Sequence, residues 1–145
     1  MISCTEFIPA YSEFFKFLHQ KAGRKEVDRF WNYLSDTYLK DTLKRLIKQH
    51  GLRGCWLYWT QTLNEEAAEF VLVLDEDNNY FGWDMRKCPS KGRLLKYRHF
   101  TPYPDYCRHC DALYNRVLKP LGYEYKIDFS RCDRAQCKGS IRKRV

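Results

Sequence analysis

The spacing of hydrophobic positions predicts helices in the first third of the chain. Ser12 is expected to cap a helix that ends at Gly23. From 27 to 47, apolar residues recur at steps of three and four until Gly51, which predicts a second amphipathic helix of about seven turns with a break near Ser35. An apolar stripe of this kind is typical of helices that pack on a core.

The middle of the chain changes period. Segments 54–60, 69–75 and 80–85 are short and rich in β-branched and aromatic residues, and 77–79 has turn composition. This pattern predicts a three-stranded antiparallel meander. The connection at 63–68 is expected to be a loop or one helical turn.

The last third combines a helix with a hairpin. Cys88 and Pro89 are expected to end the third strand, because proline cannot continue a hydrogen-bonded ladder. A short helical turn is predicted at 94–95. Three longer elements follow, one helix and two strands: 104–118, 123–129 and 136–141.

These elements predict one α+β domain over residues 1–145, with a helical part at 1–51 and a sheet and cysteine-rich part at 52–145. The N-terminal helices would pack on an antiparallel sheet of four to five strands, and one further helix would carry a Cys-x-x-Cys motif. The length of 145 residues is enough for a single core.

Composition excludes several classes of protein. With 44% hydrophobic and 30% charged residues the chain has the material to fold, and no apolar run is long enough to span a membrane. The first residues lack the layout of a secretory signal, so we expect a cytoplasmic protein that does not bind a membrane. In that compartment cysteines stay reduced, and their spacing is better interpreted as metal binding or chemistry.

The net charge of +8 adds a candidate anion-binding surface. An acid-free stretch holds six basic residues, and the chain ends with three more: Arg86, Lys87, Lys91, Arg93, Lys96, Arg98 and Arg142, Lys143, Arg144. A carboxylate ligand, an anionic surface or nucleic acid could use them, and a solvated basic face is the plainer alternative. Nucleic acid is not the expected partner, because no helix-turn-helix or zinc-finger spacing is present.

Five of the seven cysteines fall in the C-terminal half of the chain: Cys88, Cys107, Cys110, Cys132 and Cys137. The Cys-Arg-His-Cys unit places two sulfurs where both can reach one tetrahedral ion. A zinc site or an iron–sulfur cluster would need the fold to bring the other cysteines to this pair. Core packing and a reactive or substrate-contacting thiol are the alternatives.

The same segment offers groups for acid–base chemistry. On a helix over 104–118, Cys107, Cys110 and Asp111 share a face, whereas His109 lies on another face with Tyr106. A thiol and a carboxylate directed into a pocket would form a nucleophile and an acid–base pair.

An acidic group interrupts the otherwise basic chain at Glu65, Glu66 and Glu69. A buried member, Glu66 above all, could serve as a general base or metal ligand, and a solvated loop is the alternative. The fingerprints of nucleotide-binding enzymes, serine hydrolases and zincins are missing from the sequence.

Several short motifs in the C-terminal half resemble a known family. They are Cys88-Pro89, the run from Tyr106 to Asp111, a helix ending near Pro120, and Cys132-Asp133. In this order they resemble the small bacterial proteins of the L-2-amino-thiazoline-4-carboxylic acid hydrolase-like family, over roughly residues 65–141.

The resemblance implies an enzyme of similar size that opens a cyclic amidine to give an N-carbamoyl cysteine. It carries over to five residues: Cys88, Cys107, Cys110, Asp111 and Cys132. The Cys-Arg-His-Cys pair, the Glu65-Glu66 segment and the basic tail depart from the family pattern and resemble a separate subgroup.

The sequence therefore predicts a hydrolase or ligand-binding protein that acts on a cyclic C–N bond of a small molecule with a carboxylate. Cys107, Cys110, Asp111, His109 and Glu66 would be catalytic, and the sequence assigns no certain cofactor to them, with zinc and an iron–sulfur cluster as the candidates. The substrate would be bound by Arg93, Arg98, His99 and Tyr106. The alternative is a non-catalytic protein that binds zinc or an iron–sulfur cluster through the five cysteines. The oligomeric state stays open, with a homodimer among the alternatives.

Overall fold

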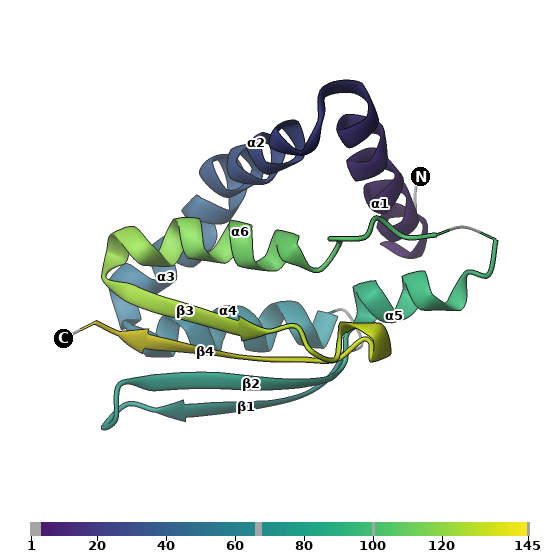
Figure 1. Cartoon of the computed structure of the whole chain (residues 1–145). Helices are drawn as coiled ribbons and strands as arrows, with labels where there is room; N and C mark the ends of the chain where they lie inside the picture. Colours follow the sequence, from purple (N-terminus) through teal and green to yellow (C-terminus); the bar gives the residue numbers. More distant parts are fainter. Residues whose placement is uncertain (1–3, 66–67, 100, 145) are drawn as a thin grey trace.

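The structure is a computed structural model that describes residues 4–65, 68–99 and 101–144. It confirms the α+β fold class (Figure 1). The helices are α1 (Cys4–Ala22), α2 (Arg24–Leu34), α3 (Lys40–His50), α4 (Leu52–Glu65), α5 (Pro89–Lys96) and α6 (Arg108–Leu118). The strands are β1 (Glu69–Asp75), β2 (Tyr80–Lys87), β3 (Tyr123–Asp128) and β4 (Cys137–Lys143). Three short segments complete the order, a π-helix and two 3₁₀ turns: η1 (Ser35–Leu39), η2 (Lys119–Leu121) and η3 (Cys132–Arg134).

The N-terminal helices follow the predicted breaks but not the predicted start. Gly23, at φ 81°, separates α1 from α2, and the break expected near Ser35 is the π-helical segment η1. Ser12 is not a cap, because α1 extends back to Cys4. The buried Ser12 hydroxyl instead accepts a hydrogen bond from the backbone N–H of Tyr103, 2.9 Å away. A tertiary contact therefore explains this serine better than helix capping does.

The segment predicted as the first strand, 54–60, is wrong, because it lies within helix α4. Its aromatic residues favour strands locally, but Cys55, Tyr58 and Trp59 are buried at helical spacing. At Gly54 the helix lies so close to the backbone of Leu46 in α3 that no side chain would fit. Burial of one helix face has overridden the β-propensity of single residues.

The sheet is antiparallel with strand order β1-β2-β4-β3. β1 and β2 form the predicted hairpin, and the expected pairing of 123–129 with 136–141 is present as β3 and β4. Trp83 of β2 lies opposite Gly139 of β4. A Cβ at Gly139 would collide with the Trp83 ring, so the glycine lets the indole lie flat against the sheet. The ring stacks there on Tyr125, with centroids 5.4 Å apart.

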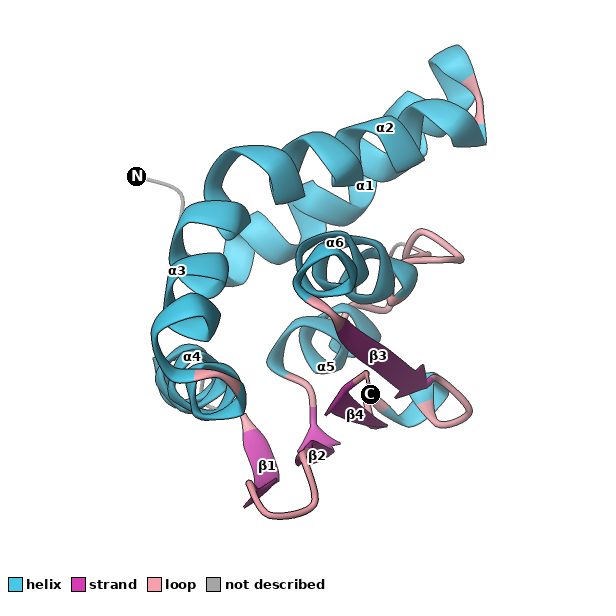
Figure 2. Cartoon of the chain, turned by 90° about the vertical axis from the view of Figure 1, so that its left-hand side faces the viewer, coloured by secondary structure: helices cyan, strands magenta, loops and turns pink. Residues whose placement is uncertain are grey.

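Two separate cores hold the chain together. The sheet core packs α3, α4 and α6 against one face of the sheet, and its fully buried residues are Leu43, Cys55, Phe81, Leu118 and Ile141. The aromatic core joins α1, α2 and α5 to the segment before α6, and consists of Phe15, Val27, Trp31, Leu94, Tyr103 and Tyr106. Helix α6 lies between α2 and the sheet and contacts both (Figure 2).

Two C-terminal elements differ in extent from the sequence prediction. α5 begins at Pro89, directly after the strand end, and runs further than the single turn expected at 94–95. α6 begins at Arg108, later than the predicted helix entry, because the preceding residues form turns that belong to the aromatic core. Among the described residues, no helix has both the length and the apolar character needed to cross a membrane.

Candidate cysteine site

The fold places the five C-terminal cysteines at the ends of four elements. Cys88 caps α5, Cys107 caps α6 and Cys110 lies in its first turn. Cys132 begins η3 and Cys137 begins β4. All five are reduced and partly exposed. Each therefore lies where a chain segment starts or ends, and not in the interior of an element packed on both sides.

Backbone and side-chain contacts bring these ends together. The N–H of Cys88 donates to the carbonyl of Ala135, at 2.8 Å, which ties the start of α5 to the turn between η3 and β4 (Figure 1). Two residues on, the Ser90 hydroxyl is hydrogen-bonded to the hydroxyl of Tyr106, at 2.5 Å. The start of α5 is thereby joined to both the β3–β4 turn and the residue before Cys107.

A further contact joins α6 to the β3–β4 turn directly. The guanidinium of Arg108 lies over the ring of Phe129, 4.9 Å from its centroid. The carbonyl of Phe129 in turn accepts a hydrogen bond from the N–H of Cys132, at 3.1 Å. The neighbours of Cys107 and Cys132 are therefore in contact.

The thiols influence one another. The pKa of Cys110 is raised well above its ordinary value, by burial first and then by four other thiols: Cys88, Cys137, Cys107 and Cys132. Burial raises the pKa of Cys137 to about 12, with Cys88 and Cys132 adding to the shift. Cys110 is therefore under the electrostatic influence of the other four cysteines that the sequence singled out.

Cys107 and Cys132 interact most directly. Burial raises the pKa of Cys107, and a hydrogen bond with the Cys132 thiol raises it further, while the Lys91 ammonium opposes the shift. The other sulfurs have partners of their own. Cys88 accepts from the N–H of Lys91 at 3.4 Å, and the indole N–H of Trp83 opposes the raised pKa of Cys137. As arranged, no three His, Cys, Asp or Glu side chains within the described ranges could hold a metal ion.

His109 and Cys110 form a second chemical pair. Nε2 of His109 lies 3.5 Å from Sγ of Cys110, although the sequence predicts that they occupy different faces of the helix. Nδ1 of His109 makes a short hydrogen bond with the backbone carbonyl of Tyr106. Because a carbonyl only accepts, Nδ1 carries a proton. Burial lowers the pKa of His109 to about 4, so the ring is neutral at pH 7 and Nε2 accepts from the Cys110 thiol.

Asp111, the predicted catalytic carboxylate within the described residues, has a different partner. Asp111 accepts a hydrogen bond from the Asn115 side chain, at 2.7 Å, one turn further along α6. Its proximity to Tyr125 contributes to the raised pKa of that residue, which burial dominates. Glu66 lies outside the described residues. The partners of a thiol nucleophile seen here are therefore a histidine and thiols.

The predicted substrate-binding residues are spread over two places. Tyr106 is buried in the aromatic core beside the cysteine site, whereas Arg98 is exposed. Arg93 donates to the hydroxyl of Tyr97 at 3.0 Å and stacks on its ring. His99 faces a separate cavity.

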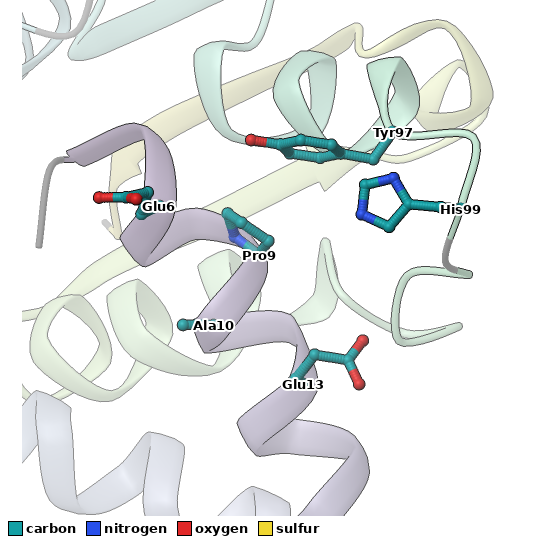
Figure 3. A pocket seen from close by; sticks show the side chains of 6 residues that line it. All are labelled: Glu6, Pro9, Ala10, Glu13, Tyr97 and His99. Atoms are coloured by element: carbon teal, nitrogen blue, oxygen red, sulfur yellow. The ribbon is translucent and has the colours of Figure 1, made fainter.

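That cavity, of about 370 Å³, lies between α1 and the segment after α5 (Figure 3). Its lining residues are Glu6, Pro9, Ala10, Glu13, Tyr97 and His99. Because none of the five cysteines contributes to the lining, this cavity and the cysteine site are distinct places in the fold.

The sequence motifs did not identify two partners of the cysteines, Lys91 and Trp83. Lys91 follows Cys88 by three residues, which is the spacing of a helix cap and its backbone donor, so the Cys-Pro-Ser-Lys run carried a usable signal. Trp83 reaches Cys137 only through the β2–β4 register, which the sequence does not specify.

Comparison with protein-family models, with curated proteins and with solved structures gives no match for this chain. The resemblance to the thiazoline hydrolase family stays a prediction.

Proposed function

We propose that this chain is a metal-binding protein, in which four of the five clustered cysteines hold a zinc ion or an iron–sulfur cluster. The observation that carries the proposal is the convergence of thiols from three separate stretches of the chain, at 88, 107–110 and 132–137. Zinc and iron–sulfur centres both take four cysteine thiolates.

Simple packing accounts less well for these cysteines. Cys55 is the contrasting case, because it is fully buried in the sheet core, whereas Cys88 and Cys137 pack against that core and stay partly exposed. The five clustered cysteines are instead partly exposed and lie at element ends. A cysteine that serves only as a small apolar residue is expected to be buried in a core and not at the exposed end of an element.

The surroundings favour an anionic centre. Cys88 and Cys107 cap α5 and α6, so the positive ends of two helix dipoles lie at the cluster, as does the Lys91 ammonium. The N–H donors beside Cys88 and Cys137 are of the kind that stabilise ligating sulfur. A bound cation would reverse the raised pKa values, since metal ligation deprotonates thiols. The thiols would also have to turn from their present partners towards the ion.

Elemental analysis and a visible spectrum of freshly purified protein test the proposal. We expect either about one zinc per chain and no colour, or iron with sulfide and a brown colour. The double variant Cys107→Ser, Cys132→Ser leaves three of the five cysteines, so it should lose most of the metal while circular dichroism shows it folded. Cys55→Ala, which removes the buried cysteine of the sheet core, is the matched control and should retain it. Parent protein without metal, purified under reducing and anaerobic conditions, would exclude the proposal.

A thiol hydrolase is the second candidate function, and the contact between Cys110 and His109 favours it. The imidazole is oriented by the Tyr106 carbonyl and presents Nε2 to the thiol, which is the arrangement of a nucleophile and its base. The family resemblance suggests 2-amino-thiazoline-4-carboxylate as the substrate to assay. Turnover that Cys110→Ala and His109→Gln each abolish, and that a chelator leaves intact, would establish this alternative.

A further inference from the structure

Cys107 and Cys132 form a pair within the cysteine site. After burial, the Cys132 thiol contributes most to the raised pKa of Cys107, although the residues lie on different elements, the cap of α6 and the 3₁₀ turn η3. The stacking of Arg108 on Phe129 and the hydrogen bond from Cys132 to the Phe129 carbonyl hold the two backbones in place. Contacts between neighbouring residues therefore keep the segments of Cys107 and Cys132 side by side.

The other three sulfurs are directed to different partners. Cys88 accepts from the backbone N–H of Lys91, Cys137 is influenced by the indole N–H of Trp83, and Cys110 contacts His109. Formation of a bond between any two of these would first require the loss of such a contact. Cys107 and Cys132 would exchange one sulfur–sulfur contact for another.

Cys132 is also open to small oxidants. It is partly exposed and is followed by Asp133 and Arg134, which are about three-quarters exposed, at 73% and 74% of their side chains. A peroxide can reach a sulfur in such a turn more readily than one in a core.

We infer that Cys107 and Cys132 are a redox-sensitive site that closes into a reversible disulfide in the presence of a peroxide. The Cys132 thiolate attacks one oxygen of hydrogen peroxide, which breaks the O–O bond and gives a sulfenic acid and hydroxide. The Cys107 sulfur then displaces the sulfenic oxygen and forms the S–S bond. In total two thiols lose two electrons and two protons, and hydrogen peroxide is reduced to two waters. A dithiol reductant restores both thiols by exchange.

The disulfide would also regulate the metal centre, and this second part rests on the proposed function. Oxidation removes two thiolates from a set of five, which leaves three and breaks four-cysteine ligation. Metal would then leave as the disulfide forms.

The two parts are tested separately on the full chain. Metal-free protein is treated with hydrogen peroxide, alkylated, digested and examined by mass spectrometry. We expect the loss of two free thiols per chain and a peptide that links Cys107 to Cys132, reversed by dithiothreitol. Cys107→Ser and Cys132→Ser should not form this link, whereas Cys88→Ser, the matched control, should form it.

Predominant linkage of other cysteines, or overoxidation of Cys132 without a link, would overturn the inference whether or not the protein binds metal. Metal-loaded protein treated in the same way should release its metal with the time course of disulfide formation. A chain that forms the disulfide but never contains metal would overturn the proposed function and leave the redox site standing. Release without the disulfide would overturn the regulatory part.

Discussion

The two cores differ in how they are built. The sheet core is closed by apolar side chains, and its central members, Phe81 and Ile141, lie opposite each other on β2 and β4 with no exposure to solvent. The aromatic core is tied by polar bonds. Ser12 holds the backbone of Tyr103, His19 contacts the Tyr103 hydroxyl at 3.2 Å, and Ser90 holds the hydroxyl of Tyr106.

The difference separates stability from positioning. Apolar burial is not directional, so the sheet core stabilises the fold without fixing a particular side chain at the site. Hydrogen bonds are directional, and those of the aromatic core fix the segment that leads into Cys107. Damage to the first core should cost stability, and damage to the second should also disturb the cysteines.

The largest expected effect is on the sheet core. Phe81→Ala leaves a cavity beneath the sheet and should lower the free energy of unfolding by about 3–5 kcal/mol, measured by urea denaturation. Val73→Ala, on the exposed face of β1 with 49% of the residue accessible, is the control and should cost far less. Cysteine alkylation rates in the folded fraction should match those of the parent protein. A selective increase at Cys107 would show that the sheet core also positions the cysteine site.

A smaller effect is expected from protonation of His109 in metal-free protein. Its pKa is lowered by burial from 6.5 to about 4, so the unfolded chain takes up a proton as the pH falls between these values while the folded chain does not. The free energy of unfolding should therefore be unaffected by this residue above pH 6.5 and should fall by up to about 3 kcal/mol on approach to pH 4. His109→Gln should flatten this part of the profile, and an unchanged profile would contradict the burial of a neutral ring.

The two buried serines offer a matched comparison. Ser12→Ala leaves the N–H of Tyr103 without its acceptor, and Ser35→Ala removes the donor to the carbonyl of Leu113, at 2.8 Å. Each should cost about 1–3 kcal/mol in urea denaturation. Only Ser12→Ala should also increase alkylation of Cys107. Of the two serine hydrogen bonds, only the one from Tyr103 to Ser12 holds the segment before α6. Equal alkylation in the two variants would show that the aromatic core does not position the site.

The smallest effect concerns an ion pair at the edge of the aromatic core. Arg24 of α2 contacts Asp105, and both side chains are more than a third exposed, at 37% and 47%. Asp105→Asn should lower the free energy of unfolding by less than about 1 kcal/mol, and the difference should shrink at high salt. A larger, salt-independent loss would mean that this pair is a structural tie comparable to Ser12.

Local sequence patterns predicted most of the fold. The break at Ser35, the stop at Gly23 and both hairpins follow from periodicity and turn residues, which act over a few neighbouring positions. The strand prediction for 54–60 was wrong because its residues individually favour strands. Only the packing of α4 on α3 and the sheet selects the helix. Ser12 failed for the same reason, since its partner Tyr103 is far away in sequence.

The candidate site was predictable in its members but not in its arrangement. Spacing alone identified the Cys-x-x-Cys unit and suggested that other cysteines would join it. The link between Cys88 and Ala135, and the pairing of Cys107 with Cys132, depend on how the β3–β4 turn meets α5 and α6. The separation of His99 from the cysteines depends on the path of the chain after α5 (Figure 3).

X-ray absorption at the edge of the bound metal tests the central claim most directly. Zinc- or iron-loaded protein should give a shell of sulfur scatterers, with about four at about 2.3 Å for zinc, and the double variant Cys107→Ser, Cys132→Ser should weaken that shell. A shell of nitrogen and oxygen at about 2.0–2.1 Å that is insensitive to these substitutions would contradict a metal centre built from the clustered cysteines.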